Sequence, residues 1–167
     1  MLARRPYSVA ELRRALERKF PNSTRVPEAI ARLREIGYLD DRKFAEQLAY
    51  SLAHNRAFGP QRVRRELKSK LVNYREIEPA ISQVYEETPA RALLEKALAR
   101  KLHSLRLPLT RARFHSLCQS LLRRGFNAGE VLKAVRERPE LRPIADEIEP
   151  ADLEGTSEEA GSDATNF

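Results

Sequence analysis

The sequence repeats at a spacing of about 50 residues, and this constrains the fold more than any other feature. Six positions of the first copy recur 51 residues later in a second copy, and again 54 residues after that in a third. The three sets are Leu12, Leu16, Lys19, Asn22, Val26 and Ile30; Val63, Leu67, Lys70, Asn73, Ile77 and Ile81; and Leu117, Leu121, Arg124, Asn127, Val131 and Val135. A period of this length, built from short helices, is typical of a tandem repeat protein. We therefore expect small stacked units.

The apolar residues are spaced as in helices almost throughout, and no stretch alternates as a strand does. This spacing predicts helices at about 8–20, 23–36, 40–55, 60–71, 74–87, 89–105, 110–124 and 128–138. The predicted fold is all-α, with tandem three-helix repeats that resemble helix-turn-helix units, at residues 1–55 and 56–106. A third repeat at 107–144 is expected to have only two helices, because Pro139 and Pro143 interrupt the chain. Residues 145–167 are acidic with few large apolar side chains, which predicts a disordered tail.

A common signal marks three of the expected helix starts. It is a capping residue followed three positions later by glutamate, as in Ser8 with Glu11, Asn73 with Glu76 and Asn127 with Glu130. The repeat extends this prediction to Asn22, so that Asn22, Asn73 and Asn127 are expected to be equivalent N-caps. Each such cap contributes roughly 1 kcal/mol of local stability.

The stretch GYLDDRKFA at residues 37–45 raises the question of whether its adjacent aspartates form a metal or catalytic pair. Gly37 suits the left-handed conformation that ends a helix. Asp40 is placed to cap the next helix, with Leu39 packing on Phe44 as a hydrophobic staple. Two carboxylates without a third ligand make a poor metal site. Helix capping is therefore the favoured interpretation.

The charge is distributed unevenly along the chain. Of the 24 acidic side chains, eight follow Arg142, so residues 1–145 hold all 31 basic side chains against 16 acidic ones. Such an excess favours a polyanionic partner, either nucleic acid or a nucleoprotein.

Several basic residues recur on equivalent helices of the three repeats. They are Arg13 and Arg14; Arg62, Arg64, Arg65, Lys68 and Lys70; and Arg123 and Arg124. Arg65 and Lys68 should project away from the apolar stripe of their helix. These residues are candidates for contacts with phosphates or with an acidic protein groove, and a merely solvated face stays the alternative. Tyr74 and Phe126 could stack on bases, although local packing is the favoured role for both.

Other functional classes find little support in the sequence. The first residues show no signal peptide, and no apolar run approaches the roughly 20 residues that span a bilayer, so a cytoplasmic protein without membrane contact is expected. The single cysteine, Cys118, cannot form an internal disulfide and is expected to be buried. His115 and Cys118 supply only two ligands, too few for a structural metal site. No phosphate-binding loop and no catalytic set can be assembled by spacing, so we expect no enzyme, cofactor or metal, although a triad assembled only in space stays open.

Four segments together resemble the RecX family of bacterial regulatory proteins. They are ARRPYSVAELRRAL, AIARLREIGYLDDRKFA, FGPQRVRRELKSK and LCQSLLRRGF, and they cover about residues 3–138. Members commonly have a glycine where this chain has Leu71, while Arg124-Gly125 keeps that pattern in the third repeat.

The resemblance implies tandem three-helix repeats in an elongated, curved array. It also implies a non-enzymatic modulator, expected to be a monomer, that binds the RecA recombinase filament on single-stranded DNA, directly or through the filament. Inhibition of ATPase, strand exchange and co-protease activity would follow, with roles in recombination, DNA repair and the SOS response. Two alternatives stay open: a helix-turn-helix DNA-binding regulator, using the helices at 110–124 and 128–138, and an interaction scaffold without nucleic acid.

Overall fold

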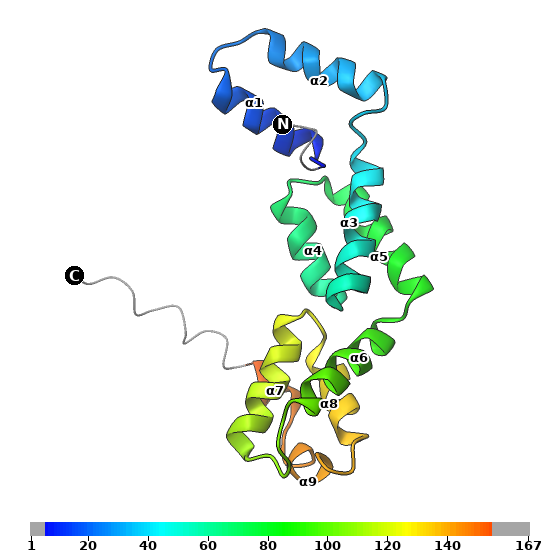
Figure 1. Ribbon diagram of the computed structural model, residues 1–167, viewed down its shortest axis with the longest axis vertical. Coiled ribbons are helices and arrows are strands. Elements are labelled where there is room, and N and C mark those ends of the chain that lie inside the picture. Colours follow the sequence, from blue (N-terminus) through cyan, green and yellow to red (C-terminus); the bar gives the residue numbers. More distant parts are fainter. Residues whose placement is uncertain (1–5, 155–167) are drawn as a thin grey trace, which may run out of the picture. The chain divides into compact units, whose positions relative to one another are not determined.

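The computed structural model describes residues 6–154, and helices are its only regular elements over that range (Figure 1). They are α1 (Val9–Lys19), α2 (Arg25–Glu35), α3 (Asp41–Arg56), α4 (Pro60–Ser69), α5 (Tyr74–Glu87), α6 (Ala90–His103), α7 (Arg111–Arg123), α8 (Ala128–Arg136), α9 (Arg142–Ala145) and α10 (Pro150–Glu154). The all-α prediction is confirmed, and the eight expected helices correspond to α1–α8. No helix within this range has both the length and the apolar content that crossing a membrane requires.

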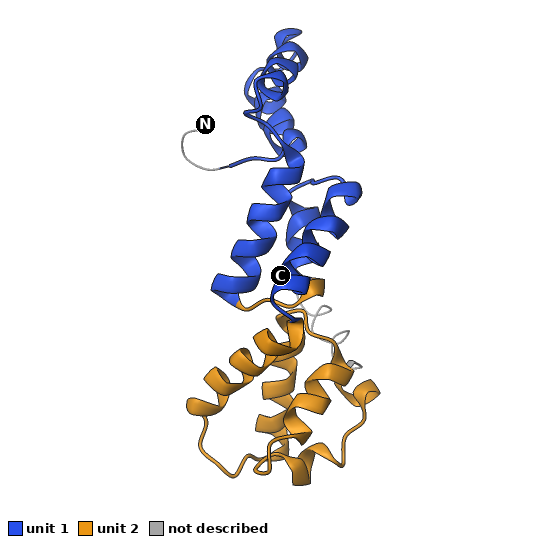
Figure 2. Ribbon diagram, turned by 90° about the vertical axis from the view of Figure 1, so that its right-hand side faces the viewer, with its two compact units in different colours: residues 1–56, 62–89 blue, residues 57–61, 90–167 orange. Residues whose placement is uncertain are grey.

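The chain folds into two compact units (Figure 2). Unit 1 comprises residues 1–56 and 62–89, with α1–α3, most of α4, and α5. Unit 2 comprises residues 57–61 and 90–167, with α6–α10. In unit 1, α2 packs on α1 and α3 packs along α5, while in unit 2 both α6 and α7 pack on α8.

These contacts relate the packing to the sequence repeat. α3 is the last helix of the first expected repeat, but it packs on α5, the second helix of the second repeat. Likewise, α6 is the last helix of the second repeat and packs on α8, the second helix of the third. A tandem repeat has no unique starting point, so the helices that pack together can be shifted by one helix from the repeat drawn on the sequence. The expected limits of the repeats themselves stay a prediction.

Three of the four N-caps expected at serine or asparagine are confirmed. Backbone N–H groups donate to Ser8 Oγ from Glu11 at 3.1 Å, to Asn73 Oδ1 from Arg75 at 3.0 Å, and to Asn127 Oδ1 from Gly129 at 2.8 Å. The prediction for Asn22 is wrong. Asn22 has a φ of 64°, and α2 begins only at Arg25, after Thr24, whose side chain makes no capping hydrogen bond. Asparagine is among the few residues that tolerate the left-handed region, so Asn22 serves the turn after α1 instead.

The turns that follow α2, α4 and α7 all use the left-handed region. Gly37 has a φ of 70°, as expected for a residue that ends a helix, and Gly125 has a φ of 90°. Leu71 occupies the position after α4 that corresponds to Gly125 after α7, and its φ of 59° shows that the leucine adopts the glycine conformation. The turn is therefore preserved, although a side chain there costs roughly 1–2 kcal/mol.

The two adjacent aspartates each hold the start of a helix. Asp40 Oδ1 accepts a hydrogen bond from the backbone N–H of Lys43 at 3.1 Å, which confirms it as the cap of α3. Asp41 Oδ1 accepts from the backbone N–H of Val9 at 2.8 Å, so it binds the N-terminus of α1 across 32 residues of sequence. A negative charge at a helix N-terminus is favourable, and here it also joins two helices.

The prediction of a disordered tail from residue 145 is wrong for residues 145–154. These residues include α10, which packs on α7 and α8, and the side chains of Ile148 and Leu153 are buried. Gln119 Nε2 also donates to the carbonyl oxygen of Leu153 at 2.6 Å. Although this segment is acidic on average, it contains two apolar side chains, and each of them stabilises the fold when buried. The rest of the expected tail, residues 155–167, lies outside the described residues.

Candidate nucleic-acid interface

Three of the five predicted basic residues around α4 are held in ion pairs within unit 1. Arg64 donates to both carboxylate oxygens of Glu78, from Nε at 2.7 Å and from Nη2 at 2.8 Å. This fork raises the pKa of Arg64 and lowers that of Glu78, chiefly through the side-chain hydrogen bond. The other two pairs join Arg62 to Glu66 at 2.7 Å and Lys70 to Glu11 at 3.5 Å.

The remaining predicted residues of α4 face solvent. Arg65 and Lys68 are exposed, while Val63 and Leu67 on the opposite side of the helix are fully buried. Neither Arg65 nor Lys68 makes an ion pair with a residue in the part of the chain that the structure describes. Their charges are thus accessible to a partner.

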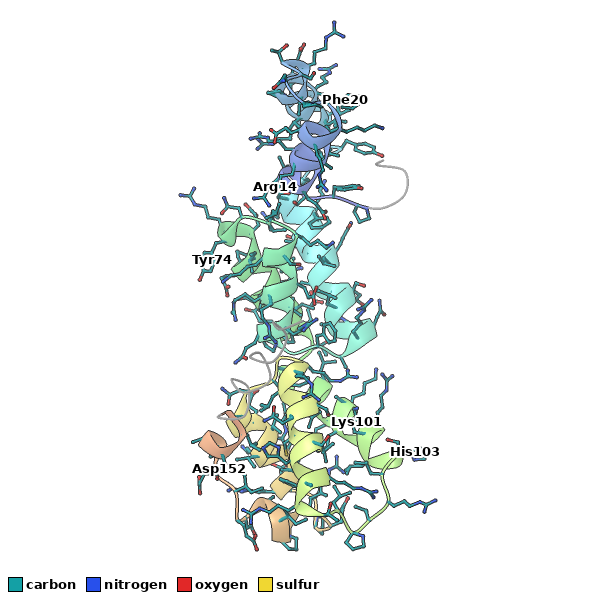
Figure 3. The ribbon with its side chains drawn as sticks, turned by 90° about the vertical axis from the view of Figure 1, so that its left-hand side faces the viewer. Arg14, Phe20, Tyr74, Lys101, His103 and Asp152 are labelled. Carbon is teal, nitrogen blue, oxygen red and sulfur yellow. The ribbon has the colours of Figure 1, made fainter. Side chains whose placement is uncertain are left out.

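The predicted residues of α1 and α7 differ in their surroundings. Arg13 and Arg14 are exposed on α1 in unit 1, with Arg14 marked in Figure 3. Arg123 is exposed at the end of α7 in unit 2. Arg124 is half-buried, and its carbonyl oxygen accepts a hydrogen bond from the backbone N–H of Gly59 at 2.7 Å. We therefore regard Arg124 as part of the turn and Arg123 as the available charge.

Gly59 and Gly125 approach each other closely within unit 2. A Cβ atom added to Gly59 would clash with the carbonyl group of Gly125 and with the ring of Phe126. The backbone N–H of Gln61 also donates to the carbonyl oxygen of Gly125 at 3.3 Å. Close backbone approach of this kind requires glycine, and it fixes the turn that follows Arg123.

Unit 2 holds basic residues that the sequence analysis missed. Arg123 lines a cavity of about 550 Å³ together with Lys101, Arg106 and Arg113. Figure 3 shows Lys101 near the end of α6, the helix that packs beside α7. A signal for these residues was present, because residues 96–129 contain eight Lys or Arg side chains and no Asp or Glu. A search for stripes on single helices overlooks it, since the residues lie on two helices and the segment between them.

The two aromatic candidates have different surroundings. Phe126 is 1% exposed, which confirms that it packs locally. The favoured interpretation is wrong for Tyr74, which is 63% exposed at the start of α5 (Figure 3). Tyr74 is thus available for stacking in unit 1.

The structure gives little support to sequence-specific readout by α7 and α8. Five of the nine residues of α8 are buried, which leaves Gly129, Glu130 and Lys133 exposed near its start. Recognition helices read base edges with arginine, asparagine or glutamine near that end. Cys118 is fully buried, as expected, and burial raises the pKa of its thiol to about 12.

Comparisons with known proteins point to one family. The family model described as "RecX, second three-helix domain" matches residues 40–81, which cover α3, α4 and the first part of α5. A regulatory protein RecX from Pelodictyon phaeoclathratiforme is 31% identical over 150 residues, which are 90% of this chain and 90% of that protein. A regulatory protein RecX from Streptomyces coelicolor is 31% identical over 140 residues, which are 82% of this chain and 72% of that protein.

A longer relative extends the comparison. The regulatory protein RecX from Oceanobacillus iheyensis is 27% identical over 154 residues, which are 92% of this chain but only 56% of that protein. No solved structure matches the chain significantly.

Proposed function

Because the chain belongs to the RecX family of regulatory proteins, we propose that it binds RecA recombinase filaments on single-stranded DNA and inhibits their activities. Those activities are ATP hydrolysis, strand exchange and co-protease activity, and the chain itself catalyses no reaction. The observation that carries this proposal is 31% identity to a regulatory protein RecX over 90% of both chains. The likeness therefore covers most of the chain rather than one helix.

The exposed basic residues of unit 1 support the proposal. Arg65 and Lys68 on α4 are accessible, and so are Arg13 and Arg14 on α1. A recombinase filament carries the phosphates of its DNA, and exposed lysine and arginine side chains bind phosphates by releasing counterions. A regulator with this surface needs no deep catalytic pocket.

The test is ATP hydrolysis by RecA on single-stranded DNA, with this protein added below stoichiometric amounts. The wild type should slow hydrolysis, and the double variant R65E/K68E should lose most of the inhibition. R18E/K19E is the matched control, because it reverses one arginine and one lysine that are also exposed in unit 1. Circular dichroism should show equal helicity for the two variants.

The outcomes separate the proposal from its alternatives. Unchanged hydrolysis at saturating wild-type protein would overturn the proposed function. Full inhibition by R65E/K68E together with its loss in R13E/R14E would move the binding face to α1. A gel shift that shows preference for one duplex sequence would instead support the helix-turn-helix regulator, and DNA binding insensitive to salt would oppose any phosphate contact.

A further inference from the structure

The cavity of unit 2 has an unusual charge balance. Its volume of about 550 Å³ lies in the range of ligand sites, about 300–1,000 Å³. Lys101 from the end of α6, Arg106 from the following segment, and Arg113 and Arg123 from α7 all line it, and no acidic side chain does. We name it the α6–α7 cavity.

The four basic side chains of the α6–α7 cavity have no acidic partner among residues 6–154. The rest of unit 2 pairs its charges more often. Arg138 lies 2.7 Å from Glu95, and in a second cavity, next to α8 and α9, Arg136 lies 3.7 Å from Asp146. Four cations gathered without a counter-charge repel one another. An anionic ligand would relieve that repulsion.

Three serines also line the α6–α7 cavity. Ser104 and Ser120 donate to the carbonyl oxygens of Lys101 and Leu117 within the chain, at 2.8 and 2.7 Å. Ser116 is exposed, and its hydroxyl makes no hydrogen bond within the described part of the chain. Serine, lysine and arginine are the side chains that commonly contact phosphate oxygens. The composition of the lining thus matches a phosphate ligand.

We propose that the α6–α7 cavity binds the phosphodiester backbone of single-stranded DNA directly. This inference deepens the proposed function, because it assigns to unit 2 a direct DNA contact that can exist without the recombinase. A concave site lined by separate cations suits a thin chain of phosphates. The flatter acidic surface of a folded protein would follow such a concave lining less closely than a single strand does.

The lining also predicts the specificity of the site. No aromatic side chain is among its lining residues, so bases have no ring on which to stack. Binding should therefore depend on phosphates and differ little between base sequences. Removing the side chain that binds one phosphate should reduce the slope of log affinity against log salt by about 0.7 for a single strand.

The experiment measures fluorescence anisotropy of labelled oligo-dT and of a mixed-sequence strand of equal length, with the full chain and without recombinase. K101Q/R113Q should weaken binding to both strands by roughly tenfold at low salt and reduce the salt slope by about 1.4. The matched control is K96Q/R100Q, which neutralises one lysine and one arginine of the same acid-free stretch. Both residues are exposed on α6, and neither lines the cavity.

The result that would overturn the inference is equal affinity of K101Q/R113Q and wild type, or an equal loss of affinity in both double variants. The second outcome would mean that only total charge matters. The melting temperature of K101Q/R113Q should be unchanged or higher, because repulsion in the cavity falls, and a large decrease would point to a structural role instead.

If the variant binds DNA normally but no longer inhibits recombinase, the cavity belongs to a protein contact. The proposed function would survive that result, while this inference would not.

Discussion

Helices α4 and α7 occupy equivalent places in the sequence repeat, but their basic side chains meet different neighbours. In unit 1, Arg64 is bound by Glu78 and Arg62 by Glu66. In unit 2, Arg113 and Arg123 of α7 face a cavity whose lining contains no acidic side chain. Two of the four basic side chains of α4 are thus paired with carboxylates, one of them on α5, whereas Arg113 and Arg123 of α7 make no ion pair with a described residue. A basic residue in a sequence is therefore not the same as a positive charge available for binding.

The turns that follow α4 and α7 differ in the residue that takes the left-handed conformation and in its burial. Leu71 holds a φ of 59° after α4, where Gly125 holds 90° after α7. Gly125 is buried against Gly59, whereas Leu71 is half-buried. The left-handed turn is common to both repeats, but only the second one lies against another backbone segment, at Gly59.

Exchanging the residues of these two turns should change the free energy of unfolding more than any other substitution proposed below. Gly125→Leu should lower the free energy of unfolding by about 3 kcal/mol, because left-handed strain adds to the overpacking of a large side chain at a buried position. Leu71→Gly should raise it by about 0.5 kcal/mol, since the relief of strain slightly exceeds the entropy cost of glycine. Urea denaturation of both variants would measure the two changes. Similar losses of stability in both would show that the turns are packed alike.

Removing an ion pair of α4 should have a moderate effect on the free energy of unfolding. Arg64→Ala should lower the free energy of unfolding by about 1 kcal/mol, because it removes a forked pair that is only partly exposed. Arg123→Ala should change it by less than about 0.5 kcal/mol, since it removes no ion pair with a described residue. Thermal and urea denaturation at neutral pH would compare the two variants.

The pH dependence of stability tests whether the Arg64–Glu78 ion pair causes the larger loss expected for Arg64→Ala. The pKa of Glu78 is lowered in the folded state, so its ionised form favours folding. The stability that Arg64 contributes should be fully present above the ordinary pKa of a glutamate. It should fade as the pH falls through the lowered pKa of Glu78. A difference between wild type and Arg64→Ala that persists in strong acid would assign the loss of stability to packing of the arginine stem instead.

Removal of residues 155–167 should have the smallest effect of the changes proposed here, a small rise in affinity for single-stranded DNA. This truncation removes Glu158, Glu159 and Asp163, and so raises the formal net charge from its present +7. Cutting after Glu154 keeps Leu153, whose side chain is buried. Affinity for random single-stranded DNA should rise by roughly twofold at low salt, and the gain should vanish near physiological salt, where the Debye length is about 8 Å. Equal affinity of both proteins at low salt would leave these acids with no role in DNA binding.

The sequence alone determined the features that depend on neighbours a few positions apart. The helical period, the caps at Ser8, Asn73 and Asn127, and the left-handed Gly37 each follow from local backbone chemistry. The resemblance of four short segments also sufficed for the family. Asn22 shows the limit of this reasoning, because its place in the repeat predicted a cap while its tolerance of the left-handed region made it a turn residue.

Only the tertiary structure decided which charges are available and which apolar residues anchor the acidic segment. Lys70 meets Glu11 across 59 residues, and Arg64 meets Glu78 across 14, so no helical spacing reveals either pair. Leu153 reaches Gln119 across 34 residues, which gives order to a segment whose composition predicts none. The α6–α7 cavity likewise joins Lys101 to Arg113 from two helices. Burial and ion pairing depend on distance in space, whereas composition and periodicity record only distance along the chain.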